Sequence, residues 1–139
     1  MKPILSKAAA QLRKQVNESF PGRDKVSDGW LGDTRHGARK SDHNPDANGW
    51  VRAIDLDRDL SGKAKPDLMP DLVDQLRIAC KNKTETRISY IIFDGRICSR
   101  IMLWRWRTYK GINKHVSHAH ISFTKDADNN GKPFAFPMI

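Results

Sequence analysis

All five histidines of this chain lie in two short segments of the sequence, and an aspartate follows the first segment. These residues are His36, His43, Asp55, His115, His118 and His120. Imidazole nitrogens and carboxylate oxygens are the usual protein ligands of a catalytic zinc ion. We therefore expect one zinc site that is assembled from two distant segments, and this site predicts a zinc enzyme.

The spacing of the histidines in the second segment indicates which roles they could have in metal binding and proton transfer. A catalytic zinc site has three protein ligands and one open position, which His43, Asp55 and one histidine of the second segment would fill. Residues two apart on a strand point to the same face, so His118 and His120 can face one cleft, where one binds the metal and the other transfers protons. His115 could reach the same cleft as a second acid, base or transition-state donor. A nearby cation lowers the proton affinity of a catalytic imidazole and keeps it available as a base.

Other metal motifs are absent from the sequence or incomplete. The HExxH motif of helical metalloproteases does not occur. Cys80 and Cys98 are too few and too far apart for a cysteine-rich zinc site or a disulfide scaffold, so we predict free, buried thiols in a reducing cytoplasm. Segment 126–131 resembles the start of a calcium loop, but Pro137 stands where that loop needs a glutamate, so we predict a polar turn.

The elements that must position these residues can be predicted from hydrophobic periodicity and turn signals. Apolar residues at helical spacing predict two amphipathic helices, and alternating or apolar runs predict strands. A long loop rich in glycine, aspartate and asparagine separates the first helix from the first strand. We expect an α+β domain in which helices flank a small, mainly antiparallel sheet. The predicted elements are a helix over 4–16, a loop over 22–48, a strand over 50–56, a helix over 68–82, a hairpin of strands over 87–93 and 96–101, and a strand over 119–123.

Composition and charge narrow the class of protein. A chain of 139 residues with 38% hydrophobic residues predicts a single soluble domain over residues 1–139. No apolar run is long enough for a membrane span, and charged residues interrupt the N-terminal apolar positions, so we expect no signal peptide. Lys and Arg outnumber Asp and Glu by 25 to 16, and the net charge of +9 predicts attraction to a polyanion. Nucleic acid, an anionic membrane surface and the bacterial cell wall all qualify.

The motifs resemble those of zinc peptidases of bacterial cell walls, a group that includes D-alanyl-D-alanine carboxypeptidases, murein endopeptidases and phage endolysins, with hedgehog as a structural relative. The resemblance covers most of the chain and is closest to compact phage endolysins. It implies a hedgehog-like or D-Ala-D-Ala peptidase-like fold and leaves open whether the enzyme is an endopeptidase or a carboxypeptidase. The matching pieces are Ser41-x-His43, Gly49, Ala53-x-Asp55 and His115-x-x-His118-x-His120.

The resemblance also implies roles for individual residues. His43, Asp55 and His120 would bind one zinc ion, and His118 would be the catalytic histidine, with His115 nearby. The substrate would be a stem peptide or cross-link of peptidoglycan. Host lysis would follow synthesis in the bacterial cytoplasm without a signal peptide. No wall-binding domain is evident, so the positive charge could attract the anionic wall, and we expect a monomer without a stable nucleic-acid partner.

Three further residues are candidates for substrate binding. Arg39 could pair with a stem-peptide carboxylate through its planar guanidinium group, or remain a solvated surface residue. Ser41, together with Asp42, could instead orient His43. His36 could approach the substrate, orient the metal ligands or hold the loop in place.

Two other classes of protein remain open. A basic chain with an Asp-His-Asn sequence and later histidines also suggests a metal-dependent nuclease of the small HNH type. A wall-binding module that retains zinc but has lost turnover is the second alternative. The aspartate in the first predicted strand and the paired histidines in the last one favour the peptidase.

Overall fold

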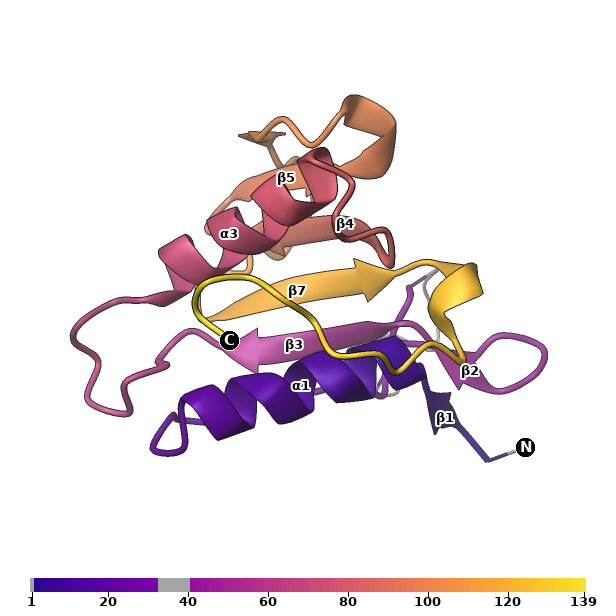
Figure 1. The fold of residues 1–139 in the computed structure, drawn as a ribbon, viewed down its shortest axis with the longest axis horizontal. Coiled ribbons are helices and arrows are strands. Elements are labelled where there is room, and N and C mark those ends of the chain that lie inside the picture. Colours follow the sequence, from indigo (N-terminus) through magenta and orange to yellow (C-terminus); the bar gives the residue numbers. More distant parts are fainter. Residues whose placement is uncertain (1, 33–40) are drawn as a thin grey trace.

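The computed structural model describes residues 2–32 and 41–139, and it confirms the α+β class. Among these residues, helices α1 (Lys7–Ser19) and α3 (Met69–Lys81) pack on one face of a five-stranded sheet (Figure 1). Every neighbouring pair of strands in this sheet is antiparallel. In spatial order the strands are β3 (Ala53–Asp57), β7 (His118–Phe123), β4 (Ile88–Phe93), β5 (Arg96–Ser99) and β6 (Arg107–Thr108).

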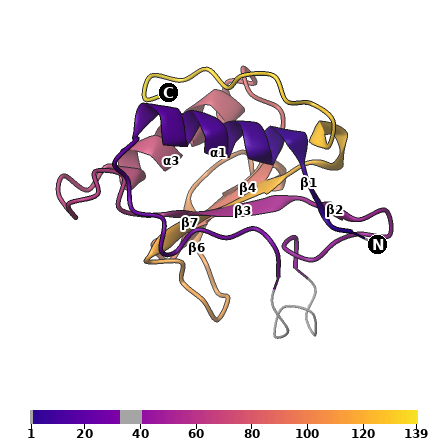
Figure 2. The same cartoon turned by 90° about the horizontal axis from the view of Figure 1, so that it is seen from below.

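A hydrophobic core fills the space between the helices and the sheet. Strand residues alternate between the two faces, and the strands place Ile54, Leu56 and Ile121 in this core. The C-terminal segment runs over the helices, where Gln15 of α1 and Gln75 of α3 each hydrogen-bond its backbone. Among the described residues, neither α1 nor α3 lies on the opposite face of the sheet, where loop segments run instead (Figure 2).

The first predicted helix begins three residues later than expected. Ile4–Leu5 forms the short strand β1, which pairs in parallel with β2 (Trp50–Val51), because the Ile4 N–H donates to the Gly49 carbonyl. The predicted strand over 50–56 is correspondingly divided into β2 and β3. The division falls at Arg52, whose guanidinium binds the carboxylates of Asp46 and Asp128.

The second helix and the hairpin agree with the predictions. Helix α3 carries Pro70 in its first turn, and Leu72, Leu76, Ala79 and Cys80 are buried on its inner face. Asp94 and Gly95 both have positive φ angles (54° and 77°), as a two-residue hairpin turn of type I′ requires. Strand β5 ends at Ser99, two residues early, because a 3-10 helix, η1, occupies Arg100–Met102.

Several smaller predictions can also be checked. Both cysteines are free and buried, as expected. The segment that resembled a calcium loop begins within a 3-10 helix, η2 (Lys125–Ala127), and the Asp128 carboxylate binds Arg52. Neither described helix has the length and apolar character needed to cross a membrane. The hedgehog-like assignment of the fold stays a prediction.

Candidate metal centre

Strands β3 and β7 bring the aspartate and two of the histidines to one face of the sheet. In the antiparallel register, Asp55 lies opposite His120 and Asp57 lies opposite His118. Ile54 and Leu56 point into the core, so Asp55 points to the loop-covered face. The alternation on β7 has the same effect for His118 and His120, because Ala119 and Ile121 lie in the core. The prediction that both histidines share a face is confirmed.

His43 reaches this face from the long loop before β2, and the backbone holds it in place. Gly29 forms an isolated antiparallel bridge with Asp55, which brings the next residue, Trp30, beside the site. The Trp30 carbonyl lies 2.8 Å from Nδ1 of His43. Because a carbonyl can only accept a hydrogen bond, Nδ1 carries the proton. In a neutral ring the other nitrogen, Nε2, then carries the lone electron pair.

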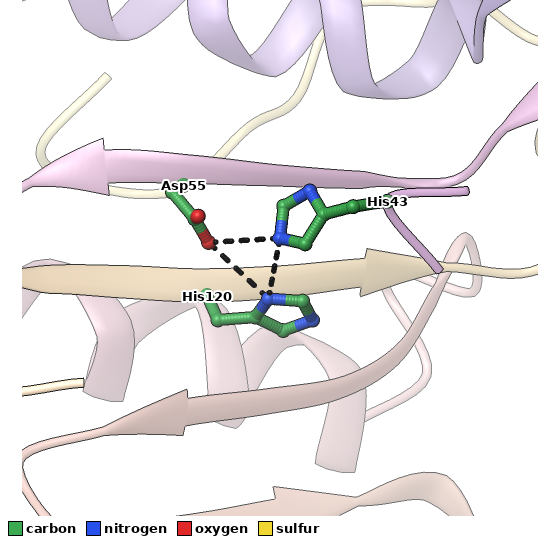
Figure 3. Close-up of side chains that lie close together, drawn as sticks. All are labelled: His43, Asp55 and His120. Carbon is green, nitrogen blue, oxygen red and sulfur yellow. Dashed lines mark hydrogen bonds and ion pairs between the residues drawn. The ribbon is translucent and has the colours of Figure 1, made fainter. Parts of the chain in front are cut away.

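Three donor atoms meet at the centre of the site (Figure 3). Nε2 of His43 lies 3.2 Å from Nδ1 of His120 and 3.3 Å from Oδ1 of Asp55. The same oxygen lies 3.2 Å from Nδ1 of His120. The His43 and His120 side chains are 7% and 6% exposed, so water screens these atoms poorly. This buried group of three residues can bind a metal ion.

The electrostatics of the three residues also favour a shared cation. Burial alone would raise the pKa of Asp55, but the hydrogen bonds and charges of His120 and His43 lower it well below its usual value. Burial alone would lower the pKa of His43, but the Asp55 carboxylate and the Trp30 carbonyl raise it. Electron pairs on two nitrogens and a carboxylate repel one another unless a proton or a metal ion lies between them. A proton or a metal ion between the three groups would relieve this repulsion.

A chain of polar groups orients the ring of His120. Its Nε2 lies 2.7 Å from the Ser122 hydroxyl, and Ser122 is paired in register with Tyr90 of β4. The Tyr90 ring stacks on the His120 ring at 5.5 Å between centroids, and the Tyr90 hydroxyl donates to Asp42 at 2.9 Å. Partners of this kind fix the orientation and protonation of metal-binding histidines. Sequence analysis identified only Asp42 among them.

His118 and His115 lie beside this centre. Nε2 of His118 is 3.7 Å from Oδ2 of Asp55, and the two histidine rings meet edge to face at 4.9 Å. Burial, together with the neighbouring His120, lowers the pKa of His118 despite the opposing effect of Asp55. Burial and the charges of His120 and His118 lower the pKa of His115 to about 4. Both rings are therefore neutral near pH 7.

The first loop contains the other predicted site residues. Ser41 accepts a hydrogen bond from the backbone N–H of His43 at 3.2 Å, which gives it a positioning contact. His36 and Arg39 lie outside the described residues. Ser41 also lines a hollow of about 620 Å³ beside the site, together with Asp42, Asn44, Pro45, Asp46, Arg52 and Tyr90.

A second cavity, of about 580 Å³, lies elsewhere, between the end of α3 and residues 124–130. Its lining includes Cys80, Arg87 and Trp104 but none of the described histidines. Of these two cavities, the hollow beside Tyr90 adjoins the candidate metal centre, because Tyr90 stacks on His120.

Comparison with known proteins gives this chain no family. No protein-family model, no curated protein and no solved structure matches it.

Proposed function

We propose that this chain is a zinc-dependent peptidase that hydrolyses a peptide bond in bacterial peptidoglycan and acts as a phage endolysin. The observation that carries the proposal is the placement of His118 beside a three-residue donor group. Its ring lies against Asp55, which also contacts both His43 and His120. In metal-assisted hydrolysis a metal ion activates water, and a nearby imidazole can transfer the protons.

Zinc is the metal that best fits the donor group. Two imidazole nitrogens and one carboxylate oxygen form a common catalytic zinc site. Donor atoms at tetrahedral angles and about 2.0–2.1 Å from a zinc ion lie about 3.3 Å from one another. The three donor atoms of His43, Asp55 and His120 are 3.2–3.3 Å apart. Little movement is therefore needed for these residues to hold the ion.

In the proposed reaction, His118 transfers the protons. The chemistry that a bound zinc ion supplies is polarisation of the scissile carbonyl and acidification of a water molecule. The lowered pKa of His118 keeps its ring neutral near pH 7. The neutral ring can therefore accept a proton from the attacking water. The same ring returns the proton to the amine nitrogen that leaves when the C–N bond breaks. His115, whose ring lies against that of His118, donates a hydrogen bond to the substrate carbonyl oxygen.

The substrate is proposed to lie along the hollow that adjoins Tyr90. Ser41 lines this hollow, and it also contacts the backbone of His43, so substrate position and metal geometry would be linked there. We propose that Arg39 and His36, from the same loop, also contact the stem peptide. The net charge of +9 would hold the protein at the anionic cell wall after it is released from the host cytoplasm.

Digestion of peptidoglycan tests the proposal directly. Purified sacculi are incubated with the protein loaded with one equivalent of zinc, with a chelated sample and with the His118→Gln variant, and product masses are measured. Release of peptide fragments by the loaded protein alone supports the peptidase and identifies the bond. If the sacculi stay intact although zinc is bound, the peptidase is wrong. Cleavage of plasmid DNA in a parallel sample would then indicate the nuclease, and intact DNA the inactive wall-binding module.

A further inference from the structure

The two oxygens of the Asp55 carboxylate face different histidines. Oδ1 contacts His43 and His120, and both dashed lines from Asp55 in Figure 3 start at this oxygen. Oδ2 instead lies toward His118, at 3.7 Å from its Nε2. One oxygen is therefore used by the candidate metal centre, and the other is directed toward a second group of donor atoms.

His115 completes this second group. The backbone holds it there, because its carbonyl accepts a hydrogen bond from the Asp94 N–H and its N–H donates to the Asn113 side chain. Nδ1 of His115 is buried and has no hydrogen-bond partner among the described residues. A buried nitrogen without a partner costs free energy unless a ligand satisfies it.

The donor atoms of this group are close enough to share an ion. One ligand atom from each of Asp55, His115 and His118 lies within 4.8 Å of the other two. Nδ1 of His118 already has a partner, because the Ser117 hydroxyl lies 3.2 Å from it. Nε2 is thus the nitrogen of His118 that remains to face Asp55.

We propose that Asp55, His115 and His118 form a second, weaker site for a divalent zinc-type ion, and that Asp55 bridges the two sites. This inference rests on the first site being a metal centre, as proposed above. The second site is the weaker one for three reasons. Its donor atoms are farther apart than those of the first site, its residues are only half-buried, and an ion there is repelled by the ion in the first site.

Occupation of the second site has a functional consequence. An ion bound to Nε2 of His118 uses the electron pair that would accept a proton from water. The same ion also uses Asp55 and holds His115 away from the substrate. Zinc in excess of one equivalent should therefore inhibit hydrolysis, although one equivalent activates it.

Metal stoichiometry tests the inference without reference to activity. The metal-free protein is titrated with zinc in competition with a coloured zinc indicator, for the wild type and for His115→Asn and His118→Gln. The matched control is Val116→Ala. Val116 lies in the same loop, its side chain is exposed, and it has no atom that could bind a metal ion. We expect the wild type and the control to bind a tight and a weaker equivalent. Each histidine variant should retain the tight equivalent and lose at least about 100-fold in affinity for the weaker one.

The possible outcomes separate this inference from the proposed function. A single tight equivalent in the wild type overturns the second site and leaves the proposed zinc centre standing. A second equivalent that survives in either histidine variant also overturns it, because the ion then lies elsewhere. Absence of any bound zinc contradicts both. Circular dichroism on each variant establishes that a lost equivalent does not reflect unfolding.

Discussion

Asp55 and His120 lie directly opposite each other on β3 and β7, and Oδ1 of Asp55 is 3.2 Å from Nδ1 of His120. This cross-strand pair joins the edge strand β3 to β7 at the site. The two side chains are held by paired strands whose other face contributes Ile54, Leu56 and Ile121 to the core. Binding of a cation at the site should therefore change the stability of the whole fold.

The first prediction concerns this coupling. At a free zinc concentration of 100 times the dissociation constant, zinc should raise the free energy of unfolding by about 2.7 kcal/mol, because only the folded chain assembles the site. Urea unfolding with zinc and with a chelator measures the difference. The His120→Asn variant should show a much smaller response. An equal response in wild type and variant would mean that the stabilising zinc binds elsewhere.

The second prediction concerns the polar chain behind His120. Ser122→Ala removes the hydroxyl that lies 2.7 Å from Nε2 of His120, and we expect zinc affinity to fall about 10-fold to 100-fold. Ser99→Ala is a matched control, since Ser99 is also a buried serine of the sheet but its hydroxyl has no hydrogen-bond partner in the described structure. Competition titrations measure both affinities. Equal losses in the two variants would indicate a general effect of a missing hydroxyl on the sheet.

The third prediction separates metal binding from proton transfer. His118→Gln should lower the rate of peptidoglycan hydrolysis by about 10²-fold to 10⁴-fold, the usual contribution of a general acid or base. The tight zinc equivalent should remain, because His43, Asp55 and His120 are unchanged. Turnover is measured with one equivalent of zinc, alongside zinc content. Full activity in this variant would show that another group transfers the proton.

The fourth prediction concerns the pH dependence of the metal-free protein. The pKa of His115 in the folded state is about 4, below its ordinary value of 6.5. As the pH falls, His115 therefore becomes protonated in the unfolded chain at a higher pH than in the folded chain. The contribution of His115 to stability is present above about pH 6.5 and is lost progressively toward about pH 4. His118, whose pKa is also lowered, acts in the same direction.

Urea unfolding between about pH 7 and about pH 5 measures this effect. The His115→Asn variant should lose less stability over that range than the wild type, since asparagine does not titrate. Asp55 contributes little there, because its ordinary pKa of 3.8 already lies below this range and its folded-state pKa is lower still, so it is ionised in both states. A pH dependence that is the same in wild type and variant would contradict the prediction.

The sequence predicted the strands and helices that carry the site because their patterns are local. Alternation along 118–123 places His118 and His120 on one face and the apolar residues on the other. The clustering of histidines then indicated that Asp55 and His43 would join them, and the structure brings these residues together. The resemblance to zinc peptidases had selected the same three ligands.

The contacts that orient the ligands could not be predicted in the same way. The carbonyl of Trp30 reaches His43 because Gly29 pairs with Asp55. Any residue type can make such a backbone contact, so the sequence does not reveal it. Ser122 lies two residues after His120, so the alternation rule could have identified it. Tyr90 reaches the site through the register between β4 and β7, which no local pattern determines.

The fifth prediction concerns how the protein associates with the cell wall. Because the chain has a net charge of +9 and the proposed substrate surface is anionic, binding to sacculi should weaken as salt increases. The screening length falls from about 10 Å at 0.1 M to about 3 Å at 1 M ionic strength, which removes long-range attraction between exposed charges. Co-sedimentation with sacculi at increasing salt, with the His118→Gln variant to prevent digestion, measures this association. Binding that does not change with salt would show that specific contacts, rather than net charge, hold the protein at the wall.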